Sequence, residues 1–90
     1  MVAPATPREA THSSARWKAI TKSDSVNITN NLGNEEIPRA VWVGGAGVVA
    51  AVDVNGNVTN FTAVAGSVLP ISPYRVNSTN TTATLLVALF

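Results

Sequence analysis

Few side chains in this sequence could take part in catalysis, and their spacing suits no common reaction. The chain has no cysteine and a single histidine, His12, followed by Ser13 and Ser14. A serine that is activated by a histidine needs an ordered scaffold and donors for the oxyanion. These residues lie instead in a stretch rich in Pro, Ala, Thr and Ser. We therefore expect no catalytic residue.

Two further clusters could in principle bind a ligand. Asp24, Glu35 and Glu36 offer oxygen ligands for a hard cation, but their spacing matches no calcium loop. The run Gly44-Gly45-Ala46-Gly47 could cradle a phosphate, but no Gly-Lys-Ser/Thr follows it and the next residues favour a strand over a helix. We expect a solvated acidic loop and a glycine turn, with no metal and no cofactor.

The charge balance excludes several classes of partner. Six Lys and Arg residues against five Asp and Glu residues leave a formal charge of +1. A formal charge this close to zero does not provide the basic surface that binds nucleic acid or the polybasic arm that binds a membrane. The longest apolar block, residues 40–52, is interrupted by glycines and is too short to span a membrane. We expect neither nucleic acid nor membrane as a partner.

The distribution of charge predicts assembly. Residues 40–90 carry only two charged side chains, Asp53 and Arg75. Such a surface is poorly suited to a free monomer, because charged side chains keep small domains apart in solution. A chain of this size also leaves much apolar surface uncovered. We therefore expect it to pack against copies of itself or within a larger assembly.

Strand patterns and turn signals recur along the chain and predict an all-β fold. Asn55-Gly56 indicates a hairpin with a type I′ turn, which needs positive φ at both residues. Pro70 indicates an edge strand or a bulge. The expected strands are 16–21, 40–43, 48–54, 58–64, 67–71, 74–77 and 84–90, with a turn at 44–47 and a long polar loop at 22–38. Turns at this spacing are typical of a small antiparallel β-sandwich or barrel.

The chain divides into two parts. Residues 1–14 have no hydrophobic period and predict a flexible N-terminal arm, while residues 15–90 form a single β-domain. In the final strand Leu85, Val87 and Leu89 alternate with an equally apolar set on the other face. Both faces of that strand need to be covered, which again predicts assembly.

A few charged and aromatic residues are the candidates for contacts with a partner. Trp, Tyr and Arg are enriched at protein interfaces, and an arginine on the arm could reach a partner's carboxylate. The predicted interface residues are Arg8, Arg16, Trp17, Tyr74, Arg75 and Phe90.

Three segments carry a family resemblance. They read PRAVWVGGAGVVAAVDVNGN from Pro38, TNFTAVAGSVLPISPYRV from Thr59 and TNTTATLLVALF from Thr79, with Ala19–Asp24 as an entry strand and Ser-Asp loop. Together they resemble the small spike base proteins of tailed phages and gene transfer agents. The matching positions Arg39, Gly44, Gly66, Pro70 and Arg75 are interpreted as fold determinants.

The resemblance implies a non-enzymatic virion structural protein. Such a protein forms a symmetric ring in the head and anchors a fibre or spike. Its partners are copies of itself and other virion proteins such as capsid or fibre chains, and it is assembled in the host cytoplasm. A capsid cement (decoration) protein or a tail or adaptor component fits the same chemistry. A carbohydrate-binding β-module that uses exposed Trp or Tyr faces is the alternative of another class.

Overall fold

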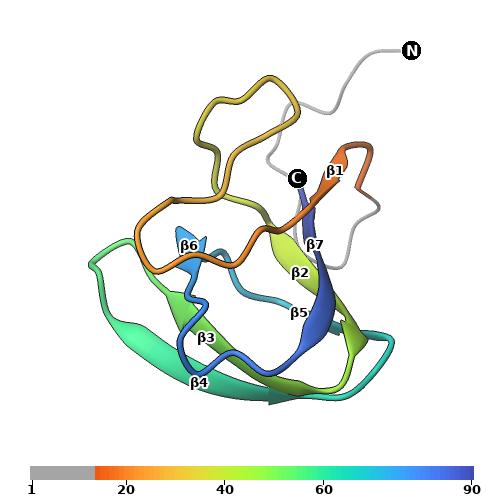
Figure 1. The fold of residues 1–90 in the computed structure, drawn as a ribbon. Helices are drawn as coiled ribbons and strands as arrows, with labels where there is room; N and C mark the ends of the chain where they lie inside the picture. The colour runs from red at the N-terminus through yellow and green to blue at the C-terminus, as the bar shows by residue number, and fades with distance from the viewer. Residues whose placement is uncertain (1–13) are drawn as a thin grey trace.

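The computed structural model describes residues 14–90, and this part of the chain contains strands and loops but no helix. Its strands form two antiparallel sheets, one with the order β1-β7-β2-β5 and one with the order β4-β3-β6 (Figure 1). The strands are β1 (Trp17–Ala19), β2 (Ala40–Gly45), β3 (Gly47–Val52), β4 (Val58–Ala63), β5 (Ser67–Leu69), β6 (Arg75–Val76) and β7 (Thr84–Leu89). The predicted antiparallel all-β fold is confirmed.

The hydrophobic core lies between the inner faces of the two sheets. Successive side chains of a strand point to opposite faces, so Val41 and Val43 of β2 are fully buried while Trp42 between them reaches the surface. The other sheet contributes Val49 and Ala51 from β3. The remaining buried core residues are Ile28, Ala63, Val76, Ala83, Leu86, Ala88 and Phe90.

The glycine run after Val43 is a corner between the sheets. Gly44 and Gly45 belong to β2 and Gly47 begins β3, with only Ala46 between the two strands. A Cβ on Gly45 would overlap the Thr84 side chain, and a Cβ on Gly47 would lie 2.6 Å from the Ala83 nitrogen. The predicted turn at 44–47 is wrong, because Gly44 and Gly45 end β2 and Gly47 begins β3. These glycines allow the chain before β7 to pass close to the corner.

The predicted hairpin is confirmed, but its turn is of another kind. β3 and β4 pair from Gly47↔Ala63 to Val52↔Val58. The Gly56 amide donates to the Asp53 carbonyl at 3.1 Å, and Asp53 Oδ1 accepts from the amides of Asn55 and Asn57 at 2.8 and 2.9 Å. Only Gly56, with φ +84°, is left-handed in this turn. The type I′ prediction is wrong because the Asp53 carboxylate stabilises a turn that needs one such residue.

A long segment connects β1 to β2 and crosses between the two sheets (Figure 1). The Ile20 amide donates to the Leu86 carbonyl of β7, and the Ser23 amide donates to the Val76 carbonyl of β6. The Ile28 side chain is buried in the core. The predicted polar loop therefore covers one side of the sandwich and contributes to its core.

The expected N-terminal arm falls largely on residues 1–13, with Arg8 and His12, which lie outside the described residues. Ser14 was expected to belong to that arm. Its hydroxyl donates to the carbonyls of Arg16 and Phe90 at 2.6 and 2.8 Å, which attaches it to the β-domain.

Candidate assembly surface

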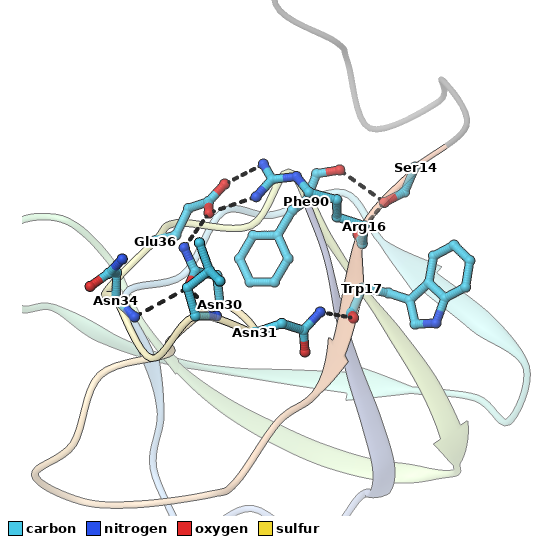
Figure 2. A network of polar contacts seen from close by, with 9 residues as sticks. Ser14, Arg16, Trp17, Asn30, Asn31, Asn34, Glu36 and Phe90 are labelled. Carbon is cyan, nitrogen blue, oxygen red and sulfur yellow. Dashed lines mark hydrogen bonds and ion pairs between the residues drawn. The ribbon is translucent and has the colours of Figure 1, made fainter.

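Three of the predicted interface residues meet where β1 runs beside the end of β7. Arg16 forms a forked ion pair with Glu36, with N–O distances of 3.0 and 2.6 Å (Figure 2). The Arg16 guanidinium also lies 5.6 Å from the centre of the Phe90 ring. Hydrogen bonds from Arg16 and Asn30 hold the pKa of Glu36 below its ordinary value of 4.5. The carboxylate that Arg16 binds in the single chain thus belongs to that chain itself, and contact of Arg16 with a partner's carboxylate stays a prediction.

Phe90 and Trp17 differ in their exposure. The Phe90 side chain is 4% exposed and packs in the core of the single chain. A contact of Phe90 with a partner therefore stays a prediction. Trp17 is 59% exposed, and Figure 2 shows its indole pointing away from the Arg16–Glu36 pair.

The loop at residues 29–36 fixes the position of β1. The Asn31 side-chain amide donates to the Trp17 carbonyl at 3.1 Å. Lys18 Nζ donates to Thr29 Oγ1 and to the Asn30 carbonyl at 2.9 and 3.2 Å. No local sequence pattern indicates the structural role of these polar residues, because their partners are distant in the chain. Together they hold Trp17 at the edge of the four-stranded sheet.

The other two candidates, Tyr74 and Arg75, lie at the start of β6. Tyr74 is 38% exposed and lines a hollow of about 220 Å³ together with Glu35, Glu36 and Ile37. Arg75 is half-buried in β6, opposite Val52 of β3, and its Nε donates to Asn77 Oδ1 at 2.9 Å. Glu36 thus contacts Arg16 and also lines the hollow beside Tyr74, while Arg75 is held by Asn77.

The outward-facing side of the four-stranded sheet carries a row of apolar side chains. The pairing register aligns Ala19, Val87, Trp42 and Val68 across its four strands. Trp42 is 36% exposed and Val68 is 45% exposed. We call this side the outer apolar face, made up of Trp17, Ala19, Trp42, Val68, Leu85, Val87 and Leu89. The β7 and Trp17 components of this face agree with the expectation from the sequence, whereas the exposed Trp42 does not follow from any local pattern.

Leu85 is the most exposed apolar side chain on the outer apolar face. It is 73% exposed and has φ +55°, in the left-handed region. A Cβ on Gly44 would lie 2.6 Å from Leu85 Cβ and 2.8 Å from Trp42 Cζ3, so Gly44 leaves room for both side chains. The left-handed conformation costs an L-residue about 1–2 kcal/mol. The fold therefore holds a large apolar side chain in water at a strained position.

The acidic residues that could have formed a cation site are separated. Asp24 accepts hydrogen bonds from the Thr79 hydroxyl and amide at 2.6 and 3.0 Å, which hold its pKa below 3.8. Glu35 accepts a hydrogen bond from the Asn27 side chain at 3.2 Å. Within residues 14–90, no three His, Cys, Asp or Glu side chains gather where they could hold a metal ion.

The part of the chain that the structure describes has no helix long and apolar enough to cross a bilayer.

No protein-family model and no curated protein matches the sequence. Among solved structures, a chain of the capsid of a native gene transfer agent particle, computed with C5 symmetry, is similar with a TM-score of 0.78. The two chains are 32% identical, and the match covers 93% of this chain and 92% of the other. This chain belongs to the phage and gene transfer agent family of virion structural proteins.

The family assignment gives the outer apolar face its significance. The described part of this virion structural protein offers no gathered cation ligands but exposes two tryptophans and a leucine on one sheet face. Large exposed apolar patches mark contact surfaces in soluble proteins. The resemblance to virion structural proteins is thus confirmed, while the spike base role is a matter for proposal.

Proposed function

We propose that this virion structural protein assembles from copies of itself into a symmetric ring in the head of a phage-like particle, where it is the base that anchors a spike or fibre. The observation that carries the proposal is the outer apolar face, with Leu85 73% exposed beside Trp42. Support comes from the similar chain, which belongs to the capsid of a gene transfer agent particle. The role is non-enzymatic.

The chemistry of the outer apolar face suits contact between protein subunits. Tryptophan and leucine side chains lose unfavourable contact with water when a neighbouring subunit covers them. The central residues, Trp42 and Val68, carry no charge that would have to be desolvated. Trp17 lies at the edge of this face, on the outer strand β1.

The remaining parts of the proposal concern location and the N-terminal segment. The protein acts within the virion and is assembled in the host cytoplasm, with neither nucleic acid nor membrane as a partner. Residues 15–90 are the β-domain that forms the ring, and residues 1–14 are an arm, attached to the β-domain through Ser14, that contacts neighbouring virion proteins with Arg8 as its charged contact. The remaining predicted contact residues are Arg16, Trp17, Tyr74, Arg75 and Phe90.

Substitution on the outer apolar face tests the assembly. Leu85→Glu places a charge where a neighbour would pack, and Val26→Glu is the matched control. Val26 is 62% exposed, and its segment runs beside β6 of the other sheet. We expect the wild type and Val26→Glu to form one defined oligomer in sedimentation experiments and Leu85→Glu to lose that oligomer. A monomeric wild type, or an unchanged Leu85→Glu oligomer, would contradict the proposal.

The position of this chain in the particle distinguishes a spike base from a cement protein and from a tail or adaptor component. We expect a labelled copy of this chain to lie at the head vertices beneath spikes or fibres, with a fixed copy number per vertex. Even coverage of the capsid surface would indicate a cement protein, and labelling of the tail would indicate a tail or adaptor component. Either result would overturn the spike base role. Glycan binding by the free monomer would instead support a carbohydrate-binding module.

A further inference from the structure

β4 is an open edge of the three-stranded sheet. The Asp53 amide donates to the Asn57 carbonyl at 2.9 Å, which makes that residue pair a hydrogen-bonded pair of the hairpin. Hydrogen-bonded pairs alternate along an antiparallel ladder, so the backbone groups of Thr59 and Phe61 also point toward β3. The backbone groups of the alternate residues, Val58, Asn60 and Thr62, therefore point outward from the sheet.

The opposite edge of β3 shows the same alternation and is fully paired. The Val52 carbonyl accepts from the Tyr74 amide, and the Ala50 carbonyl accepts from the Asn77 amide. After β6, side-chain hydroxyls act as the hydrogen-bond acceptors for this edge of β3. Thr81 Oγ1 accepts from the Ala50 amide, and Thr82 Oγ1 accepts from the Val48 amide, each at 2.9 Å. The fold thus satisfies this edge residue by residue, whereas no hydrogen bond among residues 14–90 reaches the outward groups of β4.

The other outer strands are protected in ways that β4 is not. Natural sheets guard their edges with short strands, prolines, charges or covering loops. β1 has three residues and its Trp17 carbonyl is occupied by Asn31, while β5 has three residues and is followed by Pro70. β6 has two residues and is covered by the Ser23 segment. β4 has six residues, with neither a charge nor a proline.

We propose that β4 is a second contact surface, at which it pairs antiparallel with β4 of another copy of this chain. A two-fold axis at Asn60 places Asn60 opposite its own equivalent and Val58 opposite Thr62 of the other copy. The outward N–H and C=O groups of the three residues then match those of the partner one for one. The pairing joins two three-stranded sheets into one continuous sheet, as in other strand-addition contacts.

The surroundings of β4 favour a second copy as the occupant. The strand carries no charge, so two copies meet without like-charge repulsion. Three of the exposed valines lie on or beside it: Val54 is 55% exposed, Val58 is 51% exposed and Val64 is 67% exposed. The antiparallel register brings the strand end with Val64 beside the partner's turn with Val54. Apolar contacts thus accompany the backbone pairing at both ends.

This contact is separate from the outer apolar face, because β4 belongs to the other sheet. An edge pairing of six residues buries less than the roughly 800 Å² per partner of a standard interface. We therefore expect a weak, concentration-dependent association of the isolated chain. All tests are made in the Leu85→Glu background, so that failure of the β4 contact and failure of the proposed ring are distinguishable.

Hydrogen exchange of individual amides tests which groups are covered. The amides of Thr59, Phe61 and Ala63 face β3 and should be protected at every protein concentration. The amides of Asn60 and its two outward-facing neighbours should exchange rapidly in dilute solution and become at least tenfold slower as the protein is concentrated. If they remain fast at a concentration where sedimentation shows a dimer, the dimer uses another surface and the proposal is wrong.

A charge-swap experiment tests the two-fold axis. Asn60→Lys and Asn60→Glu each place like charges opposite one another, so each variant alone should lose the association by at least tenfold. An equimolar mixture of the two should recover it, because the charges then oppose each other. Asn34→Lys is the matched control on an exposed loop and should behave as its Leu85→Glu parent. Failure of the mixture to associate, or protection of these amides only in assembled particles that contain other chains, would overturn the proposal.

Discussion

Replacing Leu85 with asparagine should separate the stability of the fold from its capacity to assemble. Leu85, the second residue of β7, has φ +55° and is 73% exposed. Leucine is poorly suited to this conformation, whereas asparagine adopts it several times more readily. We expect Leu85→Asn to fold at least as well as the wild type while it associates more weakly.

The magnitude follows from exposure and backbone conformation. About a quarter of the Leu85 side chain is buried, so its loss costs about 0.5 kcal/mol of the roughly 1.5–3 kcal/mol that full burial of a leucine contributes. Relief of the left-handed strain returns about 1 kcal/mol. The free energy of unfolding should therefore stay unchanged or rise by up to about 1 kcal/mol. In an assembly, covering the exposed part contributes about 1–2 kcal/mol per contact, a roughly 5- to 30-fold change in affinity.

Two assays measure these effects separately. Urea unfolding of dilute protein reports the stability of the single chain, and sedimentation over a range of concentrations reports association. Val26→Asn, on the segment beside β6, is the control and should leave association unchanged. A loss of more than about 1 kcal/mol in the unfolding free energy of Leu85→Asn would show that Leu85 supports its own fold. Unchanged association would show that the outer apolar face is not the contact.

Three further outcomes are expected. Gly56→Val should lower the free energy of unfolding by about 1–3 kcal/mol. Backbone strain alone causes the loss, because φ is +84° and the added Cβ would meet no atom within 4 Å. In the same urea titration, Gly56→Asn should lose less unfolding free energy. The pKa values of Asp24, Glu36 and Asp53 are held below their ordinary values by hydrogen bonds, chiefly from Thr79, Arg16 and Asn57 respectively. The stability that these three carboxylates contribute to the fold is complete above their ordinary pKa values of 3.8 and 4.5. It disappears as the pH falls through the lower pKa values of the folded state. An unfolding free energy that does not decrease between pH 6 and pH 3 would contradict this. Deletion of residues 2–13, which keeps Ser14, should leave the thermal unfolding of the β-domain nearly unchanged while it weakens incorporation into particles; an unfolded domain or normal incorporation would refute the arm.

The strands could be predicted because each depends on a local pattern. β-branched and aromatic residues identify β2 and β7, and Asn55-Gly56 with its flanking valines identifies the hairpin. Pro70 correctly predicts an edge, since β5 lies at the end of its sheet. The left-handed Gly66, with φ +77°, lies in the turn between β4 and β5. In each case the information lies within a few residues of the chain.

The glycine corner and the arginine pair could not be predicted, because their partners are distant in sequence. Gly45 and Gly47 indicate a turn when considered locally, but the constraint on them is the approach of the chain before β7. Arg16 was expected to bind a partner's carboxylate, but the loop folds back and supplies Glu36. The sequence shows which groups need a partner, whereas only the folded chain shows which partner is within reach.

The sequence by itself determines that this chain forms an antiparallel β-domain with few charges and with strands that are apolar on both faces. These properties depend on composition and on the two-residue period of a strand. The tertiary structure decides which apolar residues remain exposed. It buries Phe90 in the core, and within residues 14–90 it leaves the side chains of Leu85 and Trp17 largely exposed, while the loop at residues 20–38 covers one side of the sandwich. Sheet order likewise decides that β4 is left with unpaired backbone groups, since the pairing of a strand depends on the strands that lie beside it.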